Sequence, residues 1–170
     1  MYLINCILII FGVINIFSPL QQDDYAKYQA IVKFIKYTTW SENNSNEIII
    51  MAATDKDDFE KMQKYFSNLQ TDNPRIKLTK LNSLDETANV HVIYISETAQ
   101  ITPTEIKEKI TNQQILSLTT DKNLLNYGIM FYFNATDNCT DYLYNRQAVI
   151  ESGLTIRSSL LNYTHQYTIN

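Results

Sequence analysis

Side chains that carry catalysis in other proteins are few in this chain. It holds two histidines, His91 and His165, and two cysteines, of which Cys139 lies outside the first twenty residues. His91 lies inside an apolar run, where a hydrogen-bonded core histidine is the ordinary role, and no pattern brings His165 close to it. Cys139 stands between acidic residues in what reads as a polar turn, and their charge disfavours a reactive thiolate. These residues predict neither a metal site nor a nucleophilic catalyst.

Sequence motifs for phosphate, metal and acyl-transfer chemistry are also absent. The chain contains no Gly-x-Gly-x-x-Gly, no Walker loop, no His-Glu-x-x-His and no Gly-x-Ser-x-Gly. The acidic segment at residues 54–58 resembles part of a calcium loop, but it lacks the central Gly and the distal bidentate Glu. Helix capping by Thr54 or Asp55 is the better interpretation. We predict that the chain is not an enzyme and has no catalytic residue and no cofactor.

Hydroxyl and carboxyl side chains follow three of the expected strands. Ligands of open α/β sheets collect outside the carboxyl ends of parallel strands, so these residues form a candidate ligand crevice for a small nucleotide-like or amino-acid ligand. The same side chains can instead cap loops and helices, and both interpretations stay open. The candidate crevice consists of Thr54, Asp55, Ser96, Thr98, Thr119 and Asp121.

Buried strands must position this crevice. Residues 90–96 are β-branched and almost continuously apolar, which is typical of a strand buried on both faces. Residues 47–53 predict a second buried strand, and residues 75–81 alternate like a strand at a sheet edge. Further strands are expected over 114–119, 128–134 and 141–145, and helices over 25–40, from 54 or 55 to 68, 104–110, 145–152 and 155–163.

The order of these elements predicts an α/β fold. Strand–helix–strand units imply a mainly parallel sheet between helix layers, so we expect a three-layer sandwich with helices on both faces. The last two strands add an antiparallel hairpin to this mixed sheet. A chain of 170 residues with 45% apolar residues suffices for one domain. The net charge of -4 disfavours a nucleic-acid partner.

The first twenty residues carry no charged side chain and contain an apolar run. This run is short for a membrane span, so we expect a signal peptide over residues 1–20, extending at most to 22. An uncleaved anchor is the alternative. The domain is then expected over 24–165, with a tail over 166–170. Removal of the signal leaves Cys139 as the lone cysteine, which excludes an intrachain disulfide.

Tyrosines and lysines alternate along the first expected helix in a way that cannot bury all of them. Tyrosine offers apolar area and a hydroxyl together, which suits a protein interface. We therefore expect part of this helix, with the C-terminal helix around Arg157, to contact a receptor or a second copy of the chain. The alternative is that these tyrosines only cover the sheet. The candidate partner surface consists of Tyr25, Tyr28, Lys33, Lys36, Tyr37 and Arg157.

Four stretches of the sequence resemble the YfiR-like family of secreted bacterial proteins. The C-terminal block at residues 142–161 resembles the family's signature of Asn, an Ala-containing helix, Gly-Leu and a Ser-Ser-x-Leu-Leu-like helix. Residues 34–40 resemble its Phe-x-Lys-Phe-x-x-Trp segment, residues 90–96 its central strand, and residues 128–133 the strand before its hairpin. The four stretches occur in the family's order and spacing.

The resemblance implies a function that the residues alone do not. It implies a non-enzymatic periplasmic regulator that binds the periplasmic part of a membrane-bound sensor or diguanylate cyclase and so controls cyclic-di-GMP output, with a homodimer as a further option. A periplasmic small-ligand-binding module that uses the crevice is the alternative. Better-known members carry cysteines that form disulfides, and the single cysteine of the predicted mature chain departs from that pattern.

Overall fold

The computed structural model describes residues 22–40, 47–69, 75–84, 89–110, 113–136 and 139–168. The predicted signal peptide and the polar loop at 41–46 lie outside these ranges. The strands are β1 (Thr38–Thr39), β2 (Glu47–Ala53), β3 (Arg75–Lys80), β4 (Val92–Ile95), β5 (Leu116–Thr119), β6 (Phe131–Thr136), β7 (Cys139–Tyr144), β8 (Thr155–Ile156) and β9 (His165–Gln166). The helices are α1 (Gln22–Lys36), α2 (Lys56–Asn68), α3 (Pro103–Ile110), the 3-10 helix η2 (Lys122–Tyr127), α4 (Arg146–Glu151) and α5 (Ser158–Leu161).

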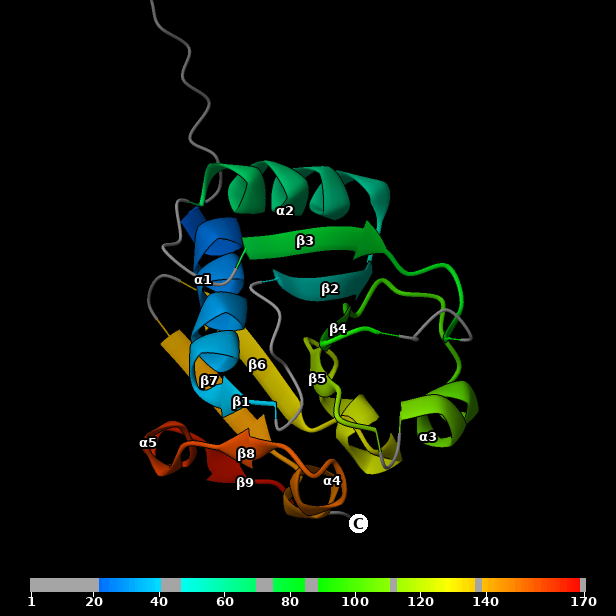
Figure 1. Cartoon of the computed structure of the whole chain (residues 1–170), viewed down its shortest axis with the longest axis vertical. Coiled ribbons are helices and arrows are strands. Elements are labelled where there is room, and N and C mark those ends of the chain that lie inside the picture. The colour runs from blue at the N-terminus through cyan, green and yellow to red at the C-terminus, as the bar shows by residue number, and fades with distance from the viewer. Residues whose placement is uncertain are drawn as a thin grey trace, which may run out of the picture.

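Strand β4 lies inside a seven-stranded sheet of order β3-β2-β4-β5-β6-β7-β9 (Figure 1). The strands from β3 to β6 pair in parallel, β7 returns antiparallel to β6, and β9 pairs in parallel with β7. All four residues of β4 are buried, as the continuous apolar sequence predicts. Strand β3 lies at the sheet edge, as its alternating pattern predicts. The α/β class with a mainly parallel mixed sheet is confirmed.

Helices α1 and α2 cover one face of the sheet. The Phe34 ring of α1 packs on the rings of Phe131 and Phe133, with centroids 4.9 and 5.7 Å away. Tyr28 of α1 packs on Phe66 of α2, with ring centroids 6.5 Å apart. These aromatic contacts join α1, α2 and β6 into one apolar core.

The opposite face of the sheet has its own apolar core. Ile93 and Ile95 of β4 point to this side, whereas Val92 and Tyr94 belong to the core under α1. Ile106 of α3 and Leu124 of η2 cover them, and α3 lies well apart from α1 and α2 in Figure 1. The molecule therefore has the expected three layers.

The first helix is shorter than its apolar pattern predicts. It ends at Lys36 instead of Trp40, and the hydroxyl of Thr38 donates to the Phe34 carbonyl at 2.8 Å. Thr38–Thr39 form β1, because adjacent β-branched residues favour the extended backbone. The half-buried Trp40 ring packs against the core under α1 and lies edge-on to His91, with ring centroids 6.0 Å apart.

The predicted final helix over 155–163 is also corrected. Thr155–Ile156 form β8, which pairs antiparallel with β1, and only Ser158–Leu161 are helical. The amide of Arg157 donates to the Tyr37 carbonyl at 2.9 Å. The two-stranded sheet of β1 and β8 therefore joins the C-terminal segment to the end of α1. This pairing is long-range, and local sequence patterns do not predict it.

The C-terminal hairpin extends further than expected. The sequence predicts a polar turn over 135–140, but β6 continues to Thr136 and β7 begins at Cys139, and these two residues pair. Cys139 is thus the first residue of a strand and not part of a wide turn. At its other end β6 begins at Phe131 instead of Gly128, because Gly128 has φ +97° and terminates η2.

Candidate functional site

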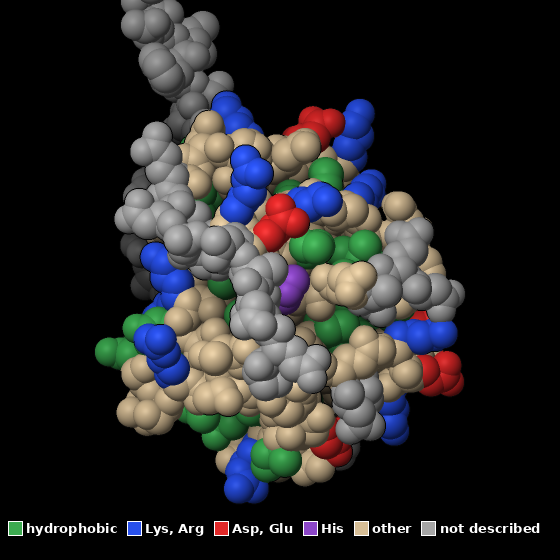
Figure 2. Space-filling view, viewed as in Figure 1, with side chains coloured by type: hydrophobic (Ala, Val, Ile, Leu, Met, Phe, Trp, Pro, Cys, Tyr) green, Lys and Arg blue, Asp and Glu red, His purple; other side chains and the backbone are tan. Residues whose placement is uncertain are grey.

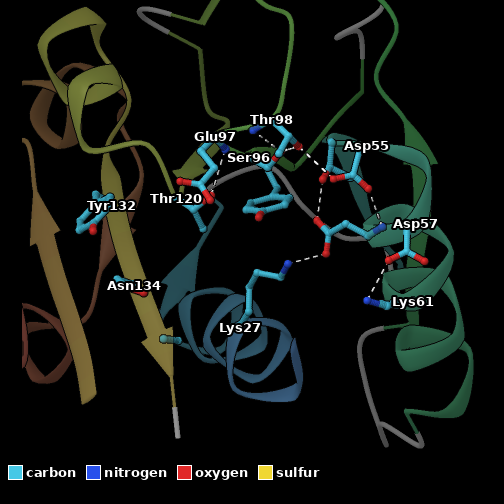
Figure 3. Close-up of a pocket in the computed structure, with 14 residues that line it drawn as sticks. Lys27, Asp55, Asp57, Lys61, Ser96, Glu97, Thr98, Thr120, Tyr132 and Asn134 are labelled. Atoms are coloured by element: carbon cyan, nitrogen blue, oxygen red, sulfur yellow. Dashed lines mark hydrogen bonds and ion pairs between the residues drawn. The ribbon is translucent and has the colours of Figure 1, made fainter. Parts of the chain in front are cut away.

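The carboxyl ends of the parallel strands surround a cavity of about 520 Å³ (Figure 3). Its walls come from the segments that follow β2, β4 and β5, from β6, and from the facing sides of α1 and α2. This is the position at which open α/β sheets bind ligands. Four of the six predicted crevice residues line it, namely Thr54, Asp55, Ser96 and Thr98.

The other two predicted crevice residues have a local role. The buried hydroxyl of Thr119 accepts a hydrogen bond of 2.9 Å from the Asp121 amide. The Asp121 carboxylate accepts one of 2.9 Å from the Asn123 amide and caps η2. Neither Thr119 nor Asp121 lines the cavity, whereas Thr120 between them does. Capping therefore accounts for these two residues, which was the alternative interpretation.

Asp58 connects α2 to both neighbouring elements on the wall of the cavity. Its carboxylate pairs with the Lys27 ammonium and accepts hydrogen bonds from the hydroxyls of Tyr28, at 2.8 Å, and Thr54, at 2.6 Å. Asp58 is 9% exposed, so it is a nearly buried carboxylate with three donors. Such an arrangement satisfies a buried charge and orients Lys27 along the cavity wall.

Asp55 caps α2 and faces the cavity mouth. Its Oδ1 accepts from the Asp58 amide at 2.9 Å, and its Oδ2 accepts from the Thr98 hydroxyl at 3.2 Å. The backbone hydrogen bond from Asp58 is the main cause that lowers the pKa of the Asp55 carboxyl, and the Thr98 hydroxyl adds to it. Asp55 is therefore ionised at neutral pH.

Tyr94 of β4 is the most deeply buried polar group in the cavity wall. Its side chain is fully buried, and its hydroxyl has no hydrogen-bond partner among the described residues. Thr120 faces this hydroxyl and slightly favours its ionised form, without reaching the geometry of a hydrogen bond. Burial raises the pKa of Tyr94 strongly, with a smaller contribution from Asp58. An unsatisfied buried hydroxyl costs about 1–3 kcal/mol.

Tyr132 of β6 adds a second phenol to the cavity wall. Partial burial raises the pKa of Tyr132, and the Asp141 carboxylate raises it further. Its hydroxyl thus stays protonated and can donate a hydrogen bond. Together with Ser96, Thr98 and Thr120 it gives the cavity a wall that is rich in hydroxyl groups.

The candidate partner surface is partly exposed and partly core. Tyr25 is 42% exposed, Lys36 and Arg157 are exposed, and Tyr37 is half-buried. The backbone bond between Arg157 and Tyr37 places the C-terminal segment beside the end of α1, as the sequence predicts. Tyr28 is the exception, because it is 2% exposed. Its ring belongs to the core under α1 and offers little area to a partner.

Lys33 lies between two tyrosine rings. Its ammonium group is 5.1 Å from the centroid of Tyr142 and 4.8 Å from that of Tyr163. Cation–π contacts of this kind fix the lysine stem against the molecule and leave its charge near the surface. Tyr163 itself is 65% exposed, so the tyrosine-rich surface extends from α1 to the end of α5.

A groove runs between α1 and α2 on this side of the molecule. It consists of two adjoining depressions of about 230 and 440 Å³, which share Tyr65 and Leu69. No carboxylate among the described residues lines either depression. Figure 2 shows basic side chains along the α1 and α2 sides of the molecule, with acidic ones among them. We call this region the α1–α2 groove, and its charged and aromatic lining consists of Tyr25, Tyr28, Lys33, Lys36, Tyr37, Lys61, Lys64 and Tyr65.

Several cavity residues were not predicted from the sequence. Tyr94 follows the period of a buried strand and was assigned to the core, although it shares one strand face with Ser96 two residues later. Lys27, Asp58 and Tyr132 come from elements whose packing onto the strand ends is tertiary. Of these four residues, Tyr94 alone could have been found from the sequence, because alternate residues of a strand share a face and Ser96 was already predicted to line the crevice.

Two classes of site find no support within the described ranges. No group of three or more His, Cys, Asp and Glu side chains there is arranged to hold a metal ion. The helices in those ranges are also too short or too polar to cross a bilayer.

A protein-family model described as YfiR/HmsC-like matches residues 25–164, which runs from α1 to the residue before β9. The match confirms the resemblance that the four sequence stretches indicate. No curated protein shows significant similarity to the chain.

Proposed function

The chain belongs to the YfiR/HmsC-like family, and on that premise we propose that it binds the periplasmic part of a membrane-bound diguanylate cyclase or sensor. Members of this family are periplasmic, non-enzymatic regulators of the cyclic-di-GMP pathway. In particular, we propose that this protein contacts the membrane partner directly and lowers the amount of cyclic-di-GMP that the partner synthesises.

The α1–α2 groove is the observation that carries this proposal. It combines four tyrosines with four lysines, and no carboxylate among the described residues lines it. Aromatic side chains supply most of the binding energy in protein interfaces, and lysines at the rim select an acidic partner. A regulator that must hold and release a receptor requires such a surface more than a deep catalytic pocket. The partner segment that fits here is apolar and acidic.

Cyclic-di-GMP in cells tests the proposal. Deletion of the gene should raise the cellular concentration of cyclic-di-GMP, and the wild-type gene should restore it. A gene carrying Tyr25→Ala and Lys36→Glu should not, because both side chains are exposed in the groove. The matched control is Lys107→Glu on α3, which lies on the opposite face of the sheet and should restore the concentration fully. An unchanged concentration after deletion would contradict the regulatory role.

A second copy of the chain is the other occupant that the groove could take. Light scattering during gel filtration distinguishes the two. If the wild type is a dimer and the Tyr25→Ala, Lys36→Glu double variant is a monomer, the groove serves self-association. A monomer that still regulates cyclic-di-GMP would assign it to the membrane partner.

A further inference from the structure

The strand-end cavity contains a polar group without a partner. The Tyr94 hydroxyl is buried and has no hydrogen bond among the described residues. The side chains that act electrostatically on this hydroxyl are Asp58, Thr120, Glu97 and Asp55. All four line the cavity, so the hydroxyl end of Tyr94 is the end that faces it. Buried polar groups in native proteins are nearly always paired, so this one indicates a bound molecule as the missing partner.

An anion does not fit this position. Helix N-termini at the ends of parallel strands bind phosphates through their free amides. Here the N-terminus of α2 is already occupied, because Asp55 accepts from the Asp58 amide and two further carboxylates follow in the first turn. A nucleotide-like ligand, one of the options that the sequence left open, is therefore disfavoured.

The charges around the cavity favour a cation. Among the described residues, four carboxylates line it against two lysines, and each lysine is paired, Lys27 with Asp58 and Lys61 with Asp57 at 2.9 Å. The carboxylates of Asp55 and Glu97 have no lysine or arginine within ion-pair distance among the described residues (Figure 3). An ammonium group of a ligand would supply the opposite charge that an ion pair with either carboxylate requires.

The rest of the wall favours a hydroxylated ligand. Ser96, Thr98, Thr120 and Tyr132 offer hydroxyl groups, and Asn134 offers an amide. A cavity of about 520 Å³ is large enough for a small organic molecule. We propose that this cavity binds a hydroxylated organic ammonium ion of the size of an amino sugar, with its ammonium group between Asp55 and Glu97 and one hydroxyl on Tyr94.

Three sugars that differ mainly in charge test the proposal. Isothermal titration of the protein, expressed from the full chain and purified from the cell envelope, would compare glucosamine, glucose and glucuronate. Glucosamine should bind, glucose should bind at least about tenfold more weakly, and glucuronate should be weaker still. Equal affinity for glucose and glucosamine, tighter binding of glucuronate, or no glucosamine binding at about 10 mM would overturn the proposal.

Variants locate the binding. Tyr94→Phe should weaken glucosamine at least about tenfold without lowering the melting temperature, since the lost hydroxyl makes no bond in the free protein. Glu97→Gln should reduce the preference for glucosamine over glucose, and this exposed residue gives a readout even where Tyr94→Phe does not fold. The control is Tyr127→Phe, because Tyr127 is 39% exposed and lies outside the cavity. Unchanged affinity in Glu97→Gln would place the ligand elsewhere.

Discussion

The hydroxyl of Tyr28 on α1 donates a hydrogen bond of 2.8 Å to the carboxylate of Asp58 on α2, thirty positions along the chain. Lys27, the preceding residue of α1, pairs with the same carboxylate. The two helices that form the partner groove are therefore joined at one wall of the strand-end cavity. Asp58 is the residue on which this arrangement depends.

Asp58→Ala should destabilise the protein by about 2–3 kcal/mol. The substitution removes the carboxylate that the Tyr28 and Thr54 hydroxyls and the Lys27 ammonium share in a largely buried position. Urea unfolding measures the change. The neighbouring variant Asp57→Ala is the control, since it removes only a surface pair with Lys61 and should cost less than about 1 kcal/mol. Equal effects of the two substitutions would refute the role of Asp58.

Gly153 ends α4 in a left-handed conformation, with φ +68°. Gly153→Ala should destabilise by about 1–2 kcal/mol through backbone strain alone. Among the described residues, a Cβ atom there would meet only the Gln114 amide nitrogen at 4.0 Å, so steric contact adds little. Gly153→Asn should cost less, because asparagine tolerates this conformation. An Ala variant that melts no lower than the Asn variant would show that the conformation is not required.

His91 should make stability depend on pH below about 6.5. Burial lowers the pKa of His91 in the folded chain, against a smaller opposite effect of Glu47, and its Nδ1 accepts from the Ile49 amide at 3.1 Å. The unfolded chain therefore binds a proton first as the pH falls, and the stability contributed by neutral His91 is present above about 6.5 and declines below it.

Melting temperatures between pH 7.5 and 5 check this dependence. His91→Phe keeps a ring beside Trp40 but removes the titrating group, so the decline should become shallower. His165→Phe, at an exposed position on the edge strand β9, is the control and should leave the decline in place. Identical profiles for the wild type and the His91 variant would contradict the prediction.

Export should remove the uncharged N-terminal segment near Leu20 to Asp23. The predicted domain then begins at residue 24, within the first turn of α1, and the family match begins at residue 25. N-terminal sequencing of the protein from the cell envelope checks the prediction. A retained Met1 would contradict cleavage and indicate that the N-terminal segment anchors the protein in the membrane.

The buried part of the fold could be predicted from the sequence, because continuous apolar runs have few alternatives. Glu47–Ala53 form β2 as predicted, and β4 lies within its predicted range. The ends of elements near Thr38 and Thr155 could not be predicted, because β1 and β8 exist only through their pairing with each other. Local propensity gives way to tertiary pairing at such positions.

The candidate site could be predicted only where it follows strand ends. Thr54, Asp55, Ser96 and Thr98 line the cavity as the topological rule predicts. At the third strand end the prediction was wrong by one residue, because Thr120 lines the cavity and Thr119 does not. Successive side chains of a strand point to opposite sides, so an error of one residue selects the wrong side. Residues contributed by α1, such as Lys27, depend on helix packing that no spacing reveals.

The most direct test of the account is affinity capture from membranes. The tagged protein should retain a membrane protein that carries a diguanylate cyclase or sensor domain, identified by mass spectrometry from solubilised membranes of the native host. The Tyr25→Ala, Lys36→Glu variant should lose it, because both side chains lie in the α1–α2 groove, whereas Tyr94→Phe should retain it. Capture of no such protein by the wild type, or equal capture by the groove variant, would contradict the account.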